Sequence, residues 1–84
     1  MDDDDCDEIL DLMGLKCPYP VLRTRKALAA LPPGSLVKVL TTDPMAKLDL
    51  THFCREAGHE LIRRDDLADR QVFLIRKGVA AIHR

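Results

Sequence analysis

Three cysteines are the side chains best suited to chemistry in this chain of 84 residues, and they stand at positions 6, 17 and 54. No two of them are separated by two residues, so their spacing indicates neither a thioredoxin-type redox pair nor a zinc knuckle. In a reducing compartment all three are expected to be free thiols. One of them must be made reactive by its surroundings if it is to act as a nucleophile.

Cys17 stands in the segment GLKCPYPV (residues 14–21), where an apolar run gives way to a helical pattern. Proline is favoured at the first position of a helix, so Cys17-Pro18 predicts Cys17 as the N-cap residue of a helix. Asp43-Pro44 predicts the same position for Asp43 in a second helix. Aspartate is an expected N-cap acceptor and cysteine is not, which singles out Cys17.

A thiolate at a helix N-terminus accepts hydrogen bonds from free N–H groups and is stabilised by the helix dipole. Pro20 removes one such donor, so the amide of Tyr19 is the expected partner, and Lys16 adds a nearby cation. These features predict that the pKa of Cys17 lies below the usual value of about 8.5 and that Cys17 is a nucleophile. The alternative is a small residue that is simply covered by the protein.

The other two cysteines have structural or passive interpretations. Cys54 falls on the apolar stripe of a predicted helix beside Phe53, as expected of core packing. Cys6 lies among acidic residues, which disfavour a thiolate. His52 and Cys54 point to different helical faces, so no metal site is expected there with His59.

No histidine stands close to Cys17 in the sequence, since the three present are at positions 52, 59 and 83. A cysteine–histidine hydrolase would need a contact through space, and a chain this short offers little pocket for a substrate. A lone activated cysteine without a resolving partner suits a reaction in which sulfur is accepted and passed on.

Hydrophobic residues make up 46% of the chain and charged residues 32%, as is usual for a soluble globular domain. Residues 1–8 contain six acids and are expected to form a disordered tail, which leaves 13 bases against 8 acids in the remainder. A basic body is usually a solvated surface, although it can also attract an acidic protein or RNA. No apolar run approaches the ~20 residues of a membrane span and no signal peptide is evident, so a cytoplasmic location is expected.

Hydrophobic periodicity predicts six elements in the order β-α-β-α-β-β. They are strands over 9–13 and 36–41, helices over 18–31 and from Asp43-Pro44 to Gly58, and strands at 61–62 and 72–76, with residues 65–70 as a loose hairpin loop. The second helix could instead begin nearer Asp49, after a turn. The expected fold class is α+β: a two-layer α/β sandwich in which two helices cover one face of a mixed four-stranded sheet.

Five segments resemble the TusA family of small sulfur carriers, whose signature is a Cys-Pro-x-Pro turn at the start of the first helix. They are DLMGLKCPYP, TTDP, DLTHFC, GHEL and FLIRKG, in this order. The resemblance runs from about Ile9 to Gly78, so the expected organisation is a tail at 1–8, a domain at 9–78 and a second tail at 79–84. One departure is Met13, where many members carry an arginine.

The resemblance implies the two-layer fold described above and a persulfide on Cys17. It implies that the sulfur comes from a protein donor, such as a cysteine desulfurase or a rhodanese-like protein, and goes to a protein acceptor. In some members of the family such relays end in 2-thiouridine formation at the wobble position of tRNA, and in others they serve dissimilatory sulfur oxidation or stand beside a membrane importer of sulfur compounds. The chain would then be a sulfurtransferase that another protein must reload, with no cofactor and no metal.

Cys17 is therefore the expected catalytic nucleophile. The residues expected to support it are Gly14, Lys16, Pro18, Tyr19 and Pro20, and those expected to dock partners are Arg23 and Lys26. An alternative is an RNA-binding module that uses the bare sheet face, although three aromatic residues are too few for a base-stacking platform. A redox regulatory module using the same thiolate is disfavoured because no resolving cysteine is indicated.

Overall fold

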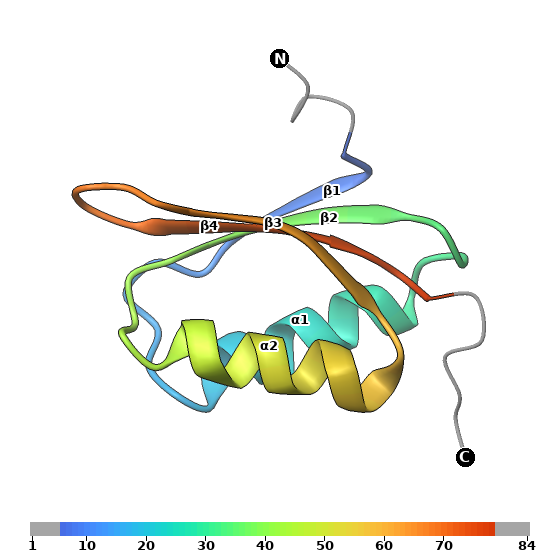
Figure 1. The fold of residues 1–84 in the computed structure, drawn as a ribbon, viewed down its shortest axis with the longest axis horizontal. Coiled ribbons are helices and arrows are strands. Elements are labelled where there is room, and N and C mark those ends of the chain that lie inside the picture. Colours follow the sequence, from blue (N-terminus) through green and yellow to red (C-terminus); the bar gives the residue numbers. More distant parts are fainter. Residues whose placement is uncertain (1–5, 79–84) are drawn as a thin grey trace.

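The computed structural model describes residues 6–78, and this part of the chain contains six secondary-structure elements joined by turns and loops (Figure 1). They are β1 (Glu8–Asp11), α1 (Tyr19–Ala29), β2 (Leu36–Thr41), α2 (Ala46–Ala57), β3 (Glu60–Asp66) and β4 (Gln71–Arg76). Their order is the predicted β-α-β-α-β-β. Neither described helix is long and apolar enough to cross a membrane.

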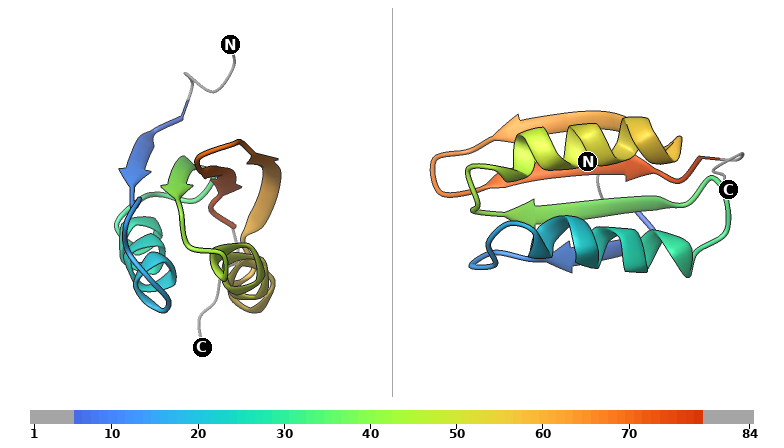
Figure 2. Two further views of the ribbon diagram at one scale, coloured as in Figure 1. Left: turned by 90° about the vertical axis from the view of Figure 1, so that its left-hand side faces the viewer. Right: turned by 90° about the horizontal axis from the view of Figure 1, so that it is seen from below.

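The sheet is mixed, with the strand order β1-β2-β4-β3. β1 pairs with β2 in parallel, whereas β4 is antiparallel to both β2 and β3. Both helices cover the same face of the sheet and leave the other face bare (Figures 1 and 2). This is the predicted α+β two-layer sandwich.

The parallel pairing of β1 and β2 decides where the helices begin. Each of these strands is followed by a helix that runs back along the sheet, so α1 and α2 start at the same end of the molecule (Figure 2). The segment before α1 and the segment before α2 are therefore neighbours, although about 25 residues separate them in the sequence.

Alternate residues of the two central strands form the middle of the core. Val37, Val39, Phe73 and Ile75 are 0% exposed and face the helices. Burying a side chain of this size contributes about 1.5–3 kcal/mol, so these residues anchor the two layers together. Cys54 of α2 lies in the same core at 2% exposure, which confirms its predicted packing role.

The N-terminal strand begins earlier than predicted. Its bounds are Glu8–Asp11 rather than 9–13. Asp7 also belongs to the fold, since its N–H donates to the Leu36 carbonyl at 2.7 Å and its carboxylate accepts from the Leu36 N–H at 2.8 Å. The end of the expected 1–8 tail is thus tied to β2, while residues 1–5 and the expected tail at 79–84 lie outside the described residues.

β3 is longer than the predicted strand at 61–62. Asp65 and Asp66, expected in a loose loop, pair with Val72 and Gln71. The loop shrinks to a turn in which the Leu67 N–H donates to the Arg70 carbonyl at 2.8 Å. The error arose because charged residues lower the apolar signal of a strand, yet β3 is an edge strand, where charged side chains are tolerated.

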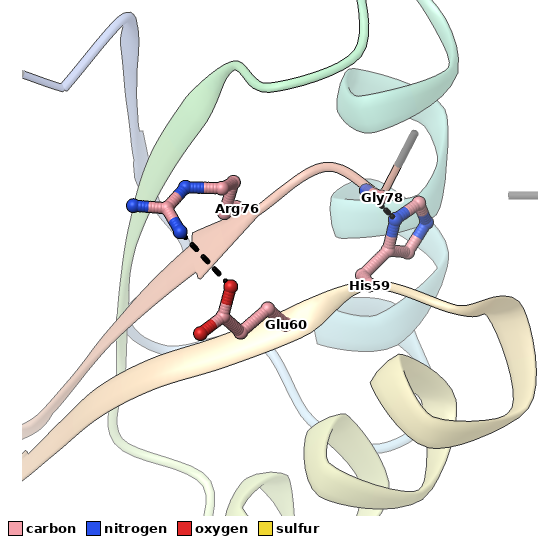
Figure 3. A network of polar contacts seen from close by, with 4 residues as sticks. All are labelled: His59, Glu60, Arg76 and Gly78. Atoms are coloured by element: carbon pink, nitrogen blue, oxygen red, sulfur yellow. Dashed lines mark hydrogen bonds and ion pairs between the residues drawn. The ribbon is translucent and has the colours of Figure 1, made fainter. Parts of the chain in front are cut away.

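The end of β4 is fastened to the start of β3 (Figure 3). Arg76 Nη1 contacts Glu60 Oε1 at 2.9 Å, and the Gly78 N–H donates to His59 Nδ1 at 3.0 Å. Gly78 passes so close to Gly58 that a Cβ atom at position 78 would overlap the Gly58 carbonyl oxygen. Glycine is therefore required at position 78 by space.

Candidate functional site

Cys17 lies in a tight turn between β1 and α1. The Tyr19 N–H donates to the Lys16 carbonyl at 2.8 Å, which closes a four-residue turn with a cis Cys17-Pro18 peptide, as in turns that carry proline at the third position. α1 begins at Tyr19 with Pro18 as its N-cap residue. The prediction that Cys17 is the N-cap residue and receives the Tyr19 amide is therefore wrong, because the turn itself uses that amide.

Asp43 is also not an N-cap residue, since α2 begins after Met45. A turn precedes this helix, as the alternative start had proposed, although the helix begins at Ala46 rather than near Asp49. The Asp43 carboxylate accepts from the Cys17 N–H at 2.8 Å and from the Met45 N–H at 3.3 Å. With 7% exposure, Asp43 is a buried acid whose desolvation is offset by these donors.

The Cys17 thiol is exposed and lies against Asp49, in the first turn of α2. The hydrogen bond to the Asp49 carboxylate raises the pKa of the Cys17 thiol above its ordinary value, and desolvation and the charges of Asp49 and Asp43 raise it further. This contradicts the predicted lowering. The prediction rested on Lys16 and the helix terminus, whereas the fold brings the carboxylates of Asp43 and Asp49 to the sulfur, and these raise the pKa of its thiol.

An open groove of about 580 Å³ begins at Cys17 and runs between the two helices. Its apolar wall includes Val21, Leu48 and Phe53. Farther along it, Arg25 lies over the Phe53 ring, with its guanidinium carbon 5.8 Å from the ring centre. An exposed thiol beside an apolar groove can be reached by a group that enters the groove.

His52 lines this groove as well, which bears on the hydrolase alternative. Its Nε2 atom lies 3.7 Å from Glu56 Oε2, and both side chains are largely exposed. The group in contact with the Cys17 thiol is the Asp49 carboxylate. The arrangement is therefore a cysteine–aspartate pair.

The predicted supporting residues occupy different places around the sulfur. Pro18 lines the groove, and Pro20 is buried in the first turn of α1. Gly14, with φ of +89°, donates its N–H to Thr42 Oγ1 at 2.9 Å, which fastens the Cys17 loop to the end of β2. Lys16 joins Gly14 at a smaller neighbouring hollow.

The predicted docking residues Arg23 and Lys26 are exposed on α1, and Tyr19 is 57% exposed at its tip. These two basic residues do not line the groove beside Cys17, where Arg25 of the same helix lies instead. They therefore offer a charged surface next to the site.

Sequence reasoning missed Asp49 as a contact of Cys17. The available signal was topological: a parallel β-α-β unit places the segment before the second helix beside the segment before the first. Asp43 stands in that second segment, and Asp49 stands in the first turn of the helix that follows it. Together with the topology, they would have predicted an acidic environment for the sulfur.

Comparisons with known proteins show the family of this chain. The family model described as "Sulfurtransferase TusA" matches residues 8–77. The putative sulfur carrier protein YrkI of Bacillus subtilis is 43% identical over 72 residues, which make up 86% of this chain and 96% of that protein. The sulfur carrier protein TusA of Pseudomonas aeruginosa is 42% identical over 71 residues, 84% of this chain and 90% of that protein.

Among solved structures, a SirA-like protein from Desulfitobacterium hafniense is similar with a TM-score of 0.75 and 27% sequence identity. The similarity covers 84% of this chain and 97% of that one. The match in fold, the family match over residues 8–77 and the relatives above lead to one conclusion. The chain belongs to the TusA family of sulfur carrier proteins.

Proposed function

We propose that Cys17 carries sulfur as a persulfide, which it takes from a protein donor and passes to a protein acceptor in the cytoplasm. The observation that supports this most is the exposed thiol, held on a proline-bounded turn at the mouth of a groove, in a chain of a sulfur-carrier family. Transfer between proteins requires an accessible sulfur at the surface more than an enclosed substrate pocket.

The chemistry is an exchange between thiol and persulfide. The Cys17 sulfur attacks the terminal sulfur of the donor persulfide, the donor S–S bond breaks, and the donor cysteine leaves as a thiol. The reverse step on an acceptor cysteine unloads the carrier. A cysteine desulfurase or a rhodanese-like protein is the proposed donor class, and the proposed outlets are 2-thiouridine formation in tRNA or sulfur oxidation.

Specificity comes from the surface around the thiol. The proposed contacts are Arg23 and Lys26 on the exposed side of α1, with Tyr19 at its tip. The other two aromatic residues of the chain, Phe53 and Phe73, are buried, which leaves no aromatic platform for stacking RNA bases. This favours protein partners, so any contact with RNA is indirect.

Loading with sulfur tests the proposal directly. The purified chain is incubated with a cysteine desulfurase and cysteine, or with a loaded rhodanese, and analysed by intact-mass and peptide mass spectrometry. One added sulfur atom is expected on Cys17, and none in the Cys17→Ser variant. Equal loading of Cys6 or Cys54, or no loading from any donor class, would refute the proposal.

A further inference from the structure

Asp49 is the side chain that contacts the reactive sulfur. It is half-buried in the first turn of α2 and lines the groove together with Cys17. The thiol donates a hydrogen bond to its carboxylate, while Asp43 holds the backbone N–H of the same cysteine. Cys17 is therefore held at its backbone by Asp43 and at its thiol by Asp49 of α2.

The charges around the sulfur come from both helices and the loops before them. On the α2 side, Asp43 and Asp49 are negative, but Asp43 is buried and already holds two backbone N–H groups. Asp49 is therefore the carboxylate that a partner can reach at the sulfur. The other charged or titratable groups of the turn and groove are Lys16, Tyr19, Arg25, His52 and Glu56.

The proton of this pair resides on sulfur. Aspartate and cysteine side chains ionise in model peptides near pH 3.9 and about pH 8.5, so a carboxylate is a far weaker base than a thiolate. A carboxylate in contact with the thiol widens this difference, because ionisation would place two negative charges side by side. Asp49 thus suppresses the thiolate that persulfide exchange requires.

A carrier of this kind needs a way to relieve that suppression when a partner arrives. Resting on the proposed function, we propose that Asp49 holds the proton on Cys17 in the empty carrier, and that a cationic side chain of the sulfur donor protein releases it by pairing with Asp49. The donor is therefore a protein that presents a lysine or arginine next to its persulfide cysteine. Its cation replaces the thiol hydrogen as the partner of the carboxylate.

The step balances without an oxidant or a reductant. When the cation engages Asp49, the Cys17 thiol loses its proton to water. The thiolate forms a bond with the terminal sulfur of the donor persulfide, whose own S–S bond breaks. The bonding pair stays on the donor cysteine sulfur, which takes up a proton. One sulfur atom is thereby transferred from the donor cysteine to Cys17.

The first test measures the resting thiol and needs no sulfur donor. Alkylation of Cys17 by iodoacetamide is followed by peptide mass spectrometry from pH 6 to 10 in the wild type, Asp49→Asn and Asp49→Ala. Both variants are expected to move the midpoint of the profile to lower pH. A midpoint lower by about one pH unit means about ten times more thiolate at neutral pH. The alkylation rate at neutral pH should rise by only about threefold, because a less basic thiolate is a weaker nucleophile.

Glu56→Gln is the matched control, because Glu56 lines the same groove but pairs with His52. Its alkylation profile is expected to overlay that of the wild type. A profile of Asp49→Asn that coincides with the wild type, or moves to higher pH, would overturn the inference that Asp49 holds the proton.

The second test separates the release by a partner from simple suppression. Sulfur loading is timed with a small uncharged donor, the persulfide of 2-mercaptoethanol, and with a persulfide-loaded donor protein. Asp49→Asn is expected to load faster than the wild type from the small donor and several-fold slower from the protein. Faster loading of the variant from both donors would refute the proposed cation pairing.

The two tests also distinguish this inference from the proposed function. If the wild type takes no sulfur from any donor protein, the carrier function fails, and with it the release by a donor cation. The alkylation profile then still decides whether Asp49 holds the proton. If the wild type loads normally while the Asp49→Asn profile is unchanged, the carrier function stands and the role of Asp49 is refuted.

Discussion

The backbone N–H of Cys17 and the carboxylate of Asp43 are joined by a hydrogen bond of 2.8 Å that spans 26 positions of the sequence. Asp43 also holds the Met45 N–H, so one buried carboxylate fixes both the reactive turn and the entry into α2. Sequence patterns had placed these two residues in equivalent but separate positions. In the fold they are partners.

Replacing this carboxylate should destabilise the protein. In Asp43→Ala two backbone N–H groups lose their acceptor, which should lower the free energy of unfolding by about 1–3 kcal/mol. Urea unfolding followed by circular dichroism measures it. Asp69→Ala, at a side chain that is 75% exposed and pairs with its neighbour Arg70, serves as control and should change stability by less than about 0.5 kcal/mol.

In the folded protein, Cys17 in the turn and Cys54 in the core should differ in their reactivity toward an alkylating agent. Cys17 is exposed, whereas burial raises the pKa of the Cys54 thiol to about 11. Iodoacetamide at pH 8 should therefore label Cys17 and spare Cys54, and both should react in 6 M guanidinium chloride, as peptide mapping would show. Labelling of Cys54 in the folded protein at the rate of Cys17 would contradict the buried position.

Stability should fall in mild acid through His59. Its Nδ1 atom accepts the Gly78 N–H, and burial, together with the charge of Lys77, lowers its pKa below the ordinary value of 6.5. Between the pKa values of His59 in the folded and unfolded states, the unfolded chain binds more protons. The contribution of neutral His59 to the free energy of unfolding is therefore fully present above about pH 6.5 and is lost as the pH falls toward the lower pKa of the folded state. The loss should be modest, because solvent screens the charge of this partly exposed ring.

Thermal unfolding from pH 7.5 to 5 in the wild type and His59→Gln tests this. The variant should show a shallower dependence on pH. His52→Gln, at an imidazole that is 69% exposed, should keep the wild-type dependence. If His59→Gln keeps the full dependence and His52→Gln abolishes it, the assignment to His59 is wrong.

A side chain at position 78 should be costly. Gly78→Ala places a Cβ atom against the Gly58 carbonyl oxygen, and such overpacking costs about 1–3 kcal/mol. Gly34→Ala provides the comparison, because its Cβ would enter open space and only its φ of +89° opposes the substitution. Chemical denaturation should rank Gly78→Ala as the more destabilised variant, and the reverse order would argue against the close approach.

Replacing the buried hydroxyl group of Thr24 should stabilise the protein. Thr24 of α1 is fully buried, and its hydroxyl has no hydrogen-bond partner in the structure. Thr24→Val keeps the shape and removes the desolvated hydroxyl, so the free energy of unfolding should rise by about 1 kcal/mol. Thr24→Ala should lower it, because a methyl group is lost from the core. A clear loss of stability in Thr24→Val would mean that the hydroxyl is satisfied in solution.

The sequence carried enough information for the architecture because its strong signals were local. In β2 the alternation in LVKVLT matches the alternation of buried residues, and in α1 the buried residues Thr24 and Leu28 stand at helical spacing. Because burial sets these patterns, they can be read from the sequence. β3 was underestimated because Asp65 and Asp66 lie on an edge strand, where exposure to solvent removes the apolar signal.

The structure places Cys17 in an exposed turn, as expected of an accessible thiol, but its electrostatic surroundings differ from the prediction. Cys17 could be singled out from the residues beside it, and its role as a nucleophile stays a prediction. The rise in the pKa of its thiol comes from Asp49 and Asp43, which are remote in the sequence and are brought together by the parallel crossover between β1 and β2. Neighbouring residues alone could not reveal this effect, because it depends on the order of the strands.

If Cys17 carries a persulfide, as proposed, the hydrogen bond from its thiol to Asp49 can exist only in the empty carrier. A persulfide has no hydrogen on its inner sulfur, and its terminal sulfur lies about 2 Å farther out. Loading therefore detaches the cysteine from α2 and leaves a carboxylate exposed at the mouth of the groove. An acceptor protein that binds this surface can distinguish a carrier that holds sulfur from an empty one before any bond to sulfur is made.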